Sequence, residues 1–512
     1  MRQSMLQAIV ALATWVSGVT ATAHGDTTQP DMMDVKQALG EKLSSNAEVI
    51  LPSSKGFDNA TGRWSLLEPP QVNIVAIPAI EDDVVQIVKF ARDRNIPFLT
   101  YDGTHGASVT LGDMQHGLAL SMRKMSSVKL SDDGKTATIG GGTMSKTVTD
   151  ELWAAGKQTV TGTCECVSYM GPMLGGGHGW LQGHHGLVAD QVESMNVVLA
   201  DGQLKTLDRD SALMWAMKGA GHNFGVVTSV KVKIYDIQHH NWASETLVFS
   251  GDKVEAVYQA ANDHLVRNGS QPTDVANWSY WMNQPSEDPN NPVIVFYILQ
   301  EGVTAVDSAY SKPFHDIGPS SVTPAAGTYK DLAAWTQVSN DSPPCQKDGF
   351  AHPRFPIYLQ SYNPAAQKEA FDLYASSAGP SSPFNTSIFM FEGYSTEGVR
   401  KVDSSSAAFA FRDDNILCSP LVSFKPPDDP TLISKAENLG QQLRNILLKG
   451  TGRDELHAYV NYAYGTETPE QLYGSEDWRQ SKLQELKNQY DPNSEFSFFC
   501  PITRNPADEC SS

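Results

Sequence analysis

The sequence lacks the features that mark nucleic-acid-binding, membrane-spanning or repetitive proteins. Its 512 residues include 38 Lys and Arg against 58 Asp and Glu, which gives a formal net charge of −20 at pH 7. Because phosphate backbones and anionic lipids attract basic proteins, this balance argues against nucleic acid or a membrane surface as a partner. Beyond the N-terminus there is no apolar run long enough to cross a bilayer, no internal repeat and no low-complexity tract. The length instead suits two or three globular domains.

Cysteine is also scarce, with six residues in the chain. Cys164 and Cys166 are too close in sequence to pair readily with each other. The remaining four could form disulfides in an oxidising compartment, although sequence does not give their connectivity; they are Cys345, Cys418, Cys500 and Cys510. A C-x-C without a second pair nearby is weak evidence for a metal.

The N-terminus predicts a secretory route. An apolar stretch follows Arg2 and ends before Ala21-Thr22-Ala23, so we expect residues 1–23 to be a signal peptide. An anchoring helix, the alternative, would be longer and more uniformly apolar. Five N-x-S/T sequons accompany this leader, at Asn59, Asn268, Asn277, Asn340 and Asn385. Together they predict a secreted or secretory-pathway protein that is soluble after processing.

Strand and helix patterns alternate after residue 72. Val72–Pro78 and Ile96–Gly103 have the composition of buried strands, and Glu81–Arg94 between them has helical spacing of its apolar residues. This pattern predicts a β-α-β unit. From about residue 237 the chain mixes strands with amphipathic helices such as Pro430–Leu448, and the Pro-rich part 312–356 predicts long loops.

Two glycine-rich segments could bring the backbone against a ligand. The second predicted strand runs into YDGTHGAS (101–108), whose successive N–H groups could form a nest for a pyrophosphate. A histidine in this turn could be a base, a ligand or a covalent anchor, although a loop histidine is usually just polar surface. The segment 161–190 contains Gly175-Gly176-Gly177 and three histidines. No segment has G-x-G-x-x-G between a strand and a helix, so NAD is disfavoured.

Four blocks carry a more specific signal through their order and spacing. They are YDGTHGAS at 101–108, GTCECVSYMGPMLGGGHGWLQGHHGLVADQV at 162–192, GAGHNFGVVTSV at 219–230, and YVNYAYG at 459–465 followed by LKNQYDP at 486–492. Together they resemble the berberine-bridge-enzyme-like FAD-linked oxidases of the vanillyl-alcohol-oxidase superfamily. The turn departs from the family's more frequent R-x-G-G-H-S at Tyr101, Thr104 and Gly106.

The resemblance implies an α+β, two-domain, PCMH-type FAD-binding fold. Its flavin domain would be discontinuous in sequence, with an inserted substrate domain made of an antiparallel sheet covered by helices. The expected divisions are a signal peptide at 1–23, an N-terminal lead-in at 24–67, the FAD-binding domain at 68–236, the substrate domain at 237–456, and a C-terminal segment at 457–512 that returns to the FAD domain.

The resemblance also implies covalently bound FAD. His105 matches the position at which members attach the flavin 8α-methyl group, and Cys164 matches the second link, to flavin C6, of bicovalent members. Because a thiolate forms that link, we expect the site to lower the pKa of Cys164; a free or disulfide-bonded cysteine is the alternative. The other expected cofactor-binding residues are Gly103, Thr104, Gly106, Gly175, Gly176, Gly177, Asn223, Gly225 and Val226. No metal is expected, because His178, His184 and His185 have no carboxylate or cysteine at ligand spacing.

Tyr462 is the first candidate for the catalytic base. It matches the second tyrosine of a Y-x-N-Y motif that serves this purpose in some relatives, and a phenol with a pKa near ~10 needs a positive or hydrogen-bonding neighbour for it. Tyr459 and Tyr464 are close in sequence and remain alternatives. Glu392, on an expected strand of the substrate domain, is the second acid/base candidate, although a carboxylate at a strand end often simply faces water.

The function implied is oxidation of a small organic substrate by two electrons, with O2 as the acceptor and H2O2 as a product. Substrates in the family include carbohydrates and specialised metabolites; we favour a specialised metabolite, and a monomeric enzyme. One alternative is a flavin-dependent isomerase or cyclase without net oxidation, and another is a non-catalytic secreted binding glycoprotein. Four aromatic residues of the inserted domain could line a substrate pocket or pack their own sheet: Trp278, Tyr280, Trp281 and Tyr297.

Overall fold

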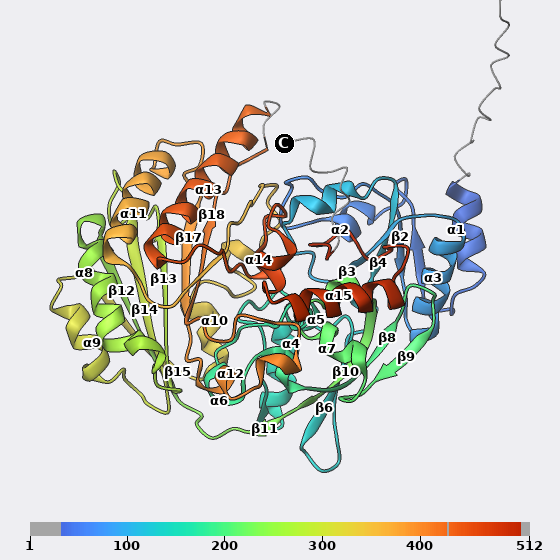
Figure 1. The fold of residues 1–512 in the computed structure, drawn as a ribbon, viewed down its shortest axis with the longest axis horizontal. Coiled ribbons are helices and arrows are strands. Elements are labelled where there is room, and N and C mark those ends of the chain that lie inside the picture. The colour runs from blue at the N-terminus through green and yellow to red at the C-terminus, as the bar shows by residue number, and fades with distance from the viewer. Residues whose placement is uncertain (1–31, 427–429, 503–512) are drawn as a thin grey trace, which may run out of the picture.

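The computed structural model describes residues 32–426 and 430–502. The predicted signal peptide and Cys510 lie outside these residues. Within the described part, no helix combines the length and the apolar composition that a membrane span requires. The chain forms two halves that lie side by side, one around two smaller sheets and the other around one large sheet (Figure 1).

The first sheet contains the predicted β-α-β unit. Its strand order is β1-β2-β4-β3, with β2, β4 and β3 parallel and β1 antiparallel. The strands are β1 (Glu48–Ile50), β2 (Val72–Ile77), β3 (Phe98–Tyr101) and β4 (Gly117–Ser121). The helix α3 (Glu81–Asp93) buries Val84, Ile87, Val88 and Ala91, which recur at helical spacing. Since β1 lies in the expected lead-in, that stretch supplies an edge strand of this sheet.

The second sheet is antiparallel and follows directly along the chain. Its order is β5-β6-β10-β8-β9, with strands β5 (Val128–Leu130), β6 (Thr136–Gly140), β8 (Val192–Val198), β9 (Leu204–Leu207) and β10 (Val226–Lys233). A glycine at positive φ turns each of the two hairpins, Gly134 at 64° and Gly202 at 74°. The helices of this region are α4 (Ser145–Ala154), α5 (Met170–Leu174), α6 (Gln182–His185) and α7 (Ala212–Met217).

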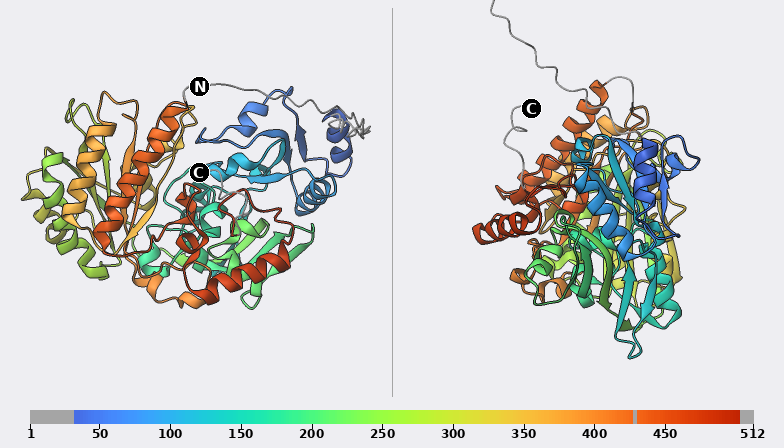
Figure 2. Two further views of the ribbon diagram at one scale, coloured as in Figure 1. Left: turned by 45° about the horizontal axis from the view of Figure 1, so that its top comes forward. Right: turned by 90° about the vertical axis from the view of Figure 1, so that its right-hand side faces the viewer.

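The third sheet has seven antiparallel strands and lies in the other half. In spatial order they are β15 (Ser321–Gly327), β12 (Trp242–Ser250), β14 (Val293–Glu301), β13 (Val275–Met282), β17 (Ile388–Gly393), β18 (Ile416–Leu421) and β16 (Ile357–Leu359). The helices α8 (Val254–Ala261), α9 (Ser308–His315), α11 (Pro364–Ala378) and α13 (Thr431–Thr451) run along one side of it (Figures 1 and 2). This is the predicted helix-covered antiparallel sheet.

Two expectations about this sheet are settled by its packing. The aromatic residues Trp278 and Trp281 are 1% and 0% exposed and pack within the core, which favours packing over a pocket-lining role. The Pro-rich part 312–356 is not only loops, because it contains strand β15 and the short helix α10 (Leu332–Trp335).

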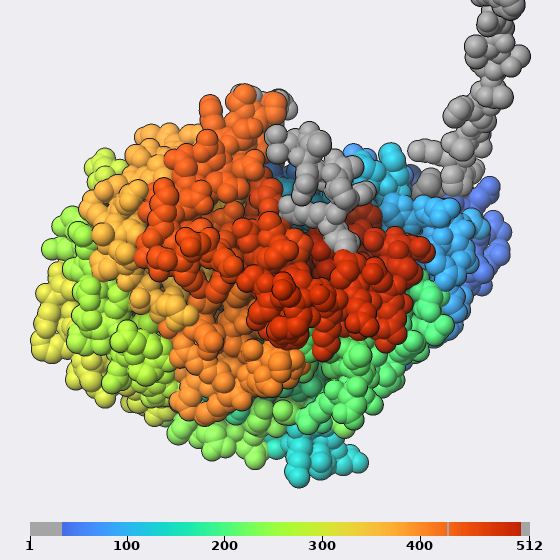
Figure 3. Space-filling view, in the orientation of Figure 1, coloured from blue at the N-terminus to red at the C-terminus, as the bar shows by residue number. Residues whose placement is uncertain are grey.

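The C-terminal segment returns to the first half. Helix α15 (Asp477–Tyr490) lies across that half, and in the space-filling view the same segment fills the surface between the two halves (Figures 1 and 3). Lys487 Nζ donates to the backbone oxygen of Asn223 at 2.9 Å and pairs with Asp491 at 2.5 Å, both contacts being buried. The remaining helices and strands are α1 (Met32–Gly40), α2 (Phe57–Thr61), β7 (Lys157–Gln158), β11 (Tyr235–Asp236), α12 (Glu397–Arg400) and α14 (Pro469–Tyr473).

Candidate active site

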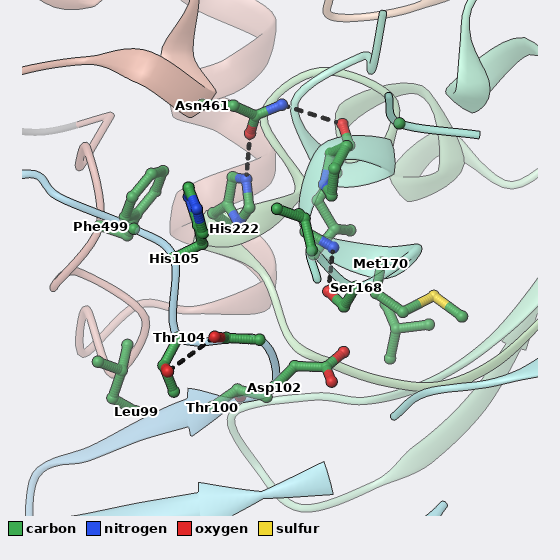
Figure 4. A pocket seen from close by; sticks show the side chains of 18 of the residues that line it. Leu99, Thr100, Asp102, Thr104, His105, Ser168, Met170, His222, Asn461 and Phe499 are labelled. Atoms are coloured by element: carbon green, nitrogen blue, oxygen red, sulfur yellow. Dashed lines mark hydrogen bonds between the residues drawn. The ribbon is translucent and has the colours of Figure 1, made fainter. Parts of the chain in front are cut away.

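One pocket gathers residues from all four sequence blocks. Its walls come from the turn after β3, from 162–174, from the loop before β10 and from 459–462, and the tail residues Phe496, Phe498 and Phe499 close one side. Two residues of the large-sheet half, Arg354 and Glu392, also line it. Figure 4 shows His105, His222, Asn461 and Phe499 grouped together, with Thr100 and Asp102 below them in this view. The pocket therefore joins the two halves.

The turn after β3 presents His105 to this pocket. Its ring stacks on Trp64 with 4.1 Å between centroids, and its Nε2 lies 2.8 Å from the Pro344 carbonyl oxygen. Because a carbonyl oxygen only accepts hydrogen bonds, Nε2 carries the proton. Burial lowers the pKa of His105 to about 4, so the ring is neutral near pH 7 and Nδ1 is unprotonated. Nδ1 is therefore the nucleophilic nitrogen.

The backbone of this turn is unusually constrained. Thr104 adopts a left-handed φ of 57°, and its hydroxyl donates to the Gly62 carbonyl at 2.9 Å. A Cβ on Gly103 would lie 2.9 Å from the Cys166 carbonyl oxygen, so this close approach requires glycine. Gly103, Thr104 and Gly106 all line the pocket, as expected of them.

Three sulfur atoms meet beside His105. Cys166 and Cys345 form a disulfide, and the thiol of Cys164 lies 3.4 Å and 3.5 Å from their sulfurs and lines the pocket. The expectation that Cys345 pairs among the last four cysteines is therefore wrong: it pairs with Cys166 across the two halves. Although His105, Cys164 and Cys166 could together suggest a metal site, the Cys166 sulfur is committed to the disulfide.

The electrostatics of Cys164 also differ from expectation. We expected a lowered pKa, but burial raises the pKa of this thiol to about 12, and the nearby Arg354 offsets only part of that shift. The thiol is thus protonated near neutral pH.

The glycine run lies behind the pocket wall. Gly175, Gly176 and Gly177 do not line the pocket, whereas their neighbours Leu174 and His178 do. A Cβ on Gly175 would lie 2.3 Å from Asn461 Oδ1, and Gly176 and Gly177 have φ of 103° and 86°. These glycines therefore let other chain segments approach, and they do not line the pocket in which we expected them.

In the loop before β10, too, only some of the expected cofactor-binding residues line the pocket. Gly225 and Val226 line the pocket. Asn223 does not; its Nδ2 donates to the Tyr473 hydroxyl at 3.2 Å and its Oδ1 accepts from the Ile502 backbone at 3.1 Å. Asn223 therefore holds the C-terminal tail against the loop that lines the pocket.

Glu392 and Tyr462, the two acid/base candidates, are in direct contact. Tyr462 donates to Glu392 Oε1 at 2.8 Å, and Tyr394 donates to Oε2 at 2.6 Å. Glu392 is 1% exposed, so the alternative of a carboxylate facing water is wrong. Burial raises the pKa of Glu392, and the two phenol hydrogen bonds and Arg354 oppose that rise.

Arg354 supplies the positive neighbour that the tyrosine needs. Its guanidinium carbon lies 3.4 Å from the centroid of the Tyr462 ring, and the residue is 8% exposed. In the described residues its side chain forms no ion pair and no hydrogen bond, although it lines the pocket. Burial and Glu392 raise the pKa of Tyr462 well above its usual value, and Arg354 lowers it. A pre-formed phenolate is therefore rare.

Tyr459 belongs to a second polar group. Its hydroxyl accepts from Asn461 Nδ2 at 2.7 Å, and Asn461 Oδ1 is 3.0 Å from His222 Nε2. Tyr464 lies outside the pocket and stacks on Phe355 at 4.7 Å. Of the three tyrosines, Tyr462 is the one that both lines the pocket and hydrogen-bonds to Glu392.

The three histidines of the segment 161–190, His178, His184 and His185, have separate environments. His178 lines the pocket, with Nδ1 2.8 Å from Gln182 Oε1 and Nε2 2.7 Å from the Tyr358 hydroxyl, and burial lowers its pKa to about 4. His184 pairs with Glu301, and His185 stacks on Tyr235; neither lines the pocket. Only His178 can touch a ligand there.

Sequence reasoning missed four residues of this site: Trp64, Asp102, Arg354 and Tyr394. Asp102 was visible within the glycine turn, and Tyr394 stands two residues after Glu392. Arg354 and Trp64 carried no signal, because each lies in a segment without a motif.

The comparisons with known proteins agree with this geometry. Residues 72–208 match a family model described as FAD binding domain, and residues 458–502 match one described as berberine and berberine like. The FAD-linked oxidoreductase chyH of Penicillium rubens is 55% identical over 498 residues, covering 97% of this chain and 99% of its own. The FAD-linked oxidoreductase chry5 of Gibberella zeae is 52% identical over 509 residues, with the same coverages.

Solved structures share the fold. BBE-like 1 of Physcomitrella patens superposes with a TM-score of 0.77 at 19% identity, covering 92% of this chain and 100% of that one. A chitooligosaccharide oxidase gives 0.76 at 20% identity, with coverages of 92% and 99%. The chain belongs to the berberine-bridge-enzyme-like family of FAD-linked oxidoreductases and has its α+β, two-domain, PCMH-type fold.

The pocket fits FAD on three observations. The turn at Gly103–Gly106 is held by glycine packing and a left-handed Thr104, as a backbone nest for a diphosphate requires. His105 lines the pocket with a neutral ring whose Nδ1 carries no proton. The buried carboxylate of Asp102 has no hydrogen-bond partner among the described residues, which leaves it available for a polar ligand.

Proposed function

We propose that this protein is an oxidase that removes two electrons from a small organic substrate and passes them through FAD to O2, giving H2O2. Bound FAD would supply the electron chemistry, and the protein supplies orientation and proton transfer. The observation that carries the proposal is the hydrogen bond from Tyr462 to Glu392, in the pocket that also contains His105.

Tyr462 and Glu392 would act together. The phenol oxygen of Tyr462 keeps lone pairs free to accept the substrate proton while its own proton passes to Glu392 Oε1. Because burial raises the pKa of Glu392, this carboxylate is a better proton acceptor than an exposed one. The relay also avoids a pre-formed phenolate, which the raised pKa of Tyr462 makes rare.

Arg354 would stabilise the negative charge that develops on this pair. A guanidinium over an aromatic face contributes about 2 kcal/mol or more when desolvated. The Arg354 guanidinium lies over the aromatic ring of Tyr462. Its positive charge also lowers the pKa of Glu392. Tyr394 would hold the other carboxylate oxygen and so fix the orientation of Glu392.

FAD would be attached covalently through His105, with Cys164 as a second attachment point. Support for His105 is its neutral ring with an unprotonated Nδ1. Cys164 faces the same pocket, but its raised pKa means that a second link would form slowly.

For the substrate we favour a specialised metabolite over a carbohydrate. The hydroxyl groups near the proton relay are already hydrogen-bonded, which leaves Arg354 as the free polar group there among the described residues: Tyr462 and Tyr394 bond to Glu392, and Tyr459 to Asn461. A sugar ring would need several free partners, whereas a flat or amphipathic molecule could pack on the tyrosine faces. The chitooligosaccharide oxidase shares the fold at 20% identity, and carbohydrate oxidation is the second candidate.

A substrate screen with peroxide detection tests this function. We expect at least one metabolite to give one H2O2 per molecule converted, with bleaching of the flavin absorbance when O2 is excluded. Product without peroxide would instead identify an isomerase or cyclase. A purified protein that carries no FAD would favour the binding-glycoprotein alternative.

We also propose a monomer that enters the secretory pathway. The disulfide Cys166–Cys345 supports this route, because disulfides persist in oxidising compartments. N-terminal sequencing of the secreted protein should begin at or near residue 24. An N-terminus that starts at Met1 would contradict this route.

A further inference from the structure

Asp102 has a buried carboxylate that forms no ion pair with any described residue. It stands at the end of β3, next to Gly103, and lines the pocket. Neither of its oxygens has a hydrogen-bond partner among the described residues. The Ser168 hydroxyl lies nearby and accepts from the Gly171 backbone at 3.1 Å (Figure 4). A buried carboxylate without a partner is costly in its ionised form.

The charges around Asp102 do not compensate for its burial. The titratable groups that face the same pocket from other elements include Arg63, Cys164, His222, Arg354 and Glu392, and His105 faces it from the same turn. His178 and the phenols of Tyr459 and Tyr462 line it as well. Among the described residues, none of these forms a hydrogen bond or ion pair with Asp102. Burial raises its pKa to about 7, with the Ser168 hydroxyl opposing that shift.

We propose that Asp102 is protonated in the FAD-bound protein and donates a hydrogen bond to a phosphate oxygen of the FAD diphosphate. This inference rests on the proposed placement of the cofactor, with its diphosphate at the turn Gly103–Gly106. An ionised carboxylate there would repel the diphosphate, whereas a carboxylic acid donates a charge-assisted hydrogen bond to it.

A proton balance follows from this assignment. Below the pKa of Asp102 in the FAD-free protein, the proton is already present and FAD binding takes up none. Above that pKa, each FAD that binds takes up one proton from the solvent. The apparent FAD dissociation constant therefore rises about tenfold per pH unit in the alkaline range.

Calorimetry of FAD binding tests this balance. The double variant His105→Ala/Cys164→Ala removes both proposed attachment points, so that binding becomes reversible. Titrations at pH 6, 7, 8 and 9, in buffers of different ionisation enthalpy, give both affinity and proton uptake. We expect one proton per FAD at pH 8 and 9, and less at pH 6.

Asp102→Asn in the same background is the matched variant, since its amide N–H also donates a hydrogen bond. We expect it to bind FAD without proton uptake and with a dissociation constant that does not change between pH 7 and 9. Asp413→Asn, which removes an exposed carboxylate with 92% of its side chain accessible, should keep the pH dependence. Binding without proton uptake in the background protein, or an equal pH dependence in Asp102→Asn, would overturn the proposal.

Thermal unfolding of the holoenzyme provides a second test if the background variant retains no FAD. A carboxyl group whose pKa is raised in the folded state makes the folded protein less stable as pH rises from about 4 towards that raised pKa. An amide at the same position does not titrate, so the Asn variant does not lose this stability. The Tm difference between Asp102→Asn and the unmodified protein should therefore grow from pH 4 to pH 8. A constant difference would overturn the proposal. Absence of FAD from the purified protein would instead count against the proposed function.

Discussion

The hydroxyl of Tyr462 donates a hydrogen bond of 2.8 Å to Glu392 Oε1, across 70 residues of sequence. The first residue belongs to the C-terminal segment and the second to strand β17 of the large sheet. The contact therefore exists only when the two halves are packed together. It links the acid/base chemistry to correct assembly of the fold.

Removing either member of this pair should slow proton abstraction. Tyr462→Phe loses the group that accepts the substrate proton, and Glu392→Gln loses the final acceptor while keeping a hydrogen-bonding shape. We expect each to lower the rate of flavin reduction by about 10²- to 10⁴-fold. Stopped-flow absorbance under anaerobic conditions measures that step directly.

Tyr394→Phe is the control for this pair, because it removes one hydrogen bond to Glu392 without touching the relay. Its effect should be smaller than that of Tyr462→Phe. Flavin reduction at an unchanged rate in both Tyr462→Phe and Glu392→Gln would refute the relay.

Arg354 should set the pH at which the enzyme becomes active. The rate rises with pH as Glu392 ionises, and Arg354 lowers the pKa of both Glu392 and Tyr462. Arg354→Met should therefore displace the rising limb of the pH–rate profile to higher pH. Each pH unit of displacement corresponds to about 1.4 kcal/mol of preference of Arg354 for the ionised over the protonated form.

Arg354→Lys keeps the charge and should show a smaller displacement, which separates charge from packing. The measurement is the pH dependence of flavin reduction between pH 5 and 10. A displacement to lower pH, or an equal displacement for Lys and Met, would contradict this role.

The disulfide should stabilise the contact between the halves. It closes a separation of 179 residues and lies beside Cys164, which lines the pocket. The double variant Cys166→Ser/Cys345→Ser should lose about 2–4 kcal/mol of unfolding free energy. The double variant is preferable because a single substitution would leave a new thiol beside Cys164. Denaturant unfolding measures the free energy of unfolding of both proteins. Equal unfolding midpoints with and without the disulfide would contradict a stabilising role for the disulfide.

Local patterns predicted the elements better than the contacts between them. The β-α-β unit followed from apolar periodicity in Val72–Pro78 and Glu81–Arg94. The structure differs by one residue at the end of the first strand, one at the end of the helix and a few at the second strand. Hairpin turns were predictable because glycine at Gly134 adopts a positive φ that other residues avoid.

Long-range contacts were beyond such reasoning. Cys166 and Cys345 come together only because the two halves pack, and Arg354 reaches Tyr462 from a Pro-rich segment with no periodicity. The raised pKa of Cys164 likewise depends on burial, which a motif does not express. Family resemblance supplied the candidates, and tertiary packing decided how each of them acts.

Burial limits which sequons can carry a glycan. Asn277 is 1% exposed in strand β13, and its Nδ2 donates to Gln271 Oε1 at 3.0 Å, so we expect no glycan there. The other four sequon asparagines are exposed: Asn59, Asn268, Asn340 and Asn385. Peptide mapping of the secreted protein, with and without enzymatic deglycosylation, measures occupancy. A glycan on Asn277 would contradict the buried position.

The two attachment points should differ in how they depend on pH. His105 is neutral above about pH 5, because burial lowers its pKa to about 4, so its link should form throughout the neutral range. Cys164 has a pKa of about 12, so only about 10⁻⁵ of it is thiolate at pH 7, and this fraction rises tenfold per pH unit. His105→Ala should therefore release its flavin on acid precipitation after maturation at pH 7. It should retain more of the flavin after long incubation at pH 9.

Cys164→Ala is the control for this prediction and should remain yellow after precipitation at either pH, because its His105 link is intact. Intact-protein mass spectrometry counts the attached FAD in each variant. If His105→Ala retained as much flavin at pH 7 as Cys164→Ala does, the Cys164 thiolate would have to be far more abundant than burial permits. The positive charge of Arg354 would then dominate the pKa of Cys164, and adding Arg354→Met to His105→Ala would remove the retained flavin.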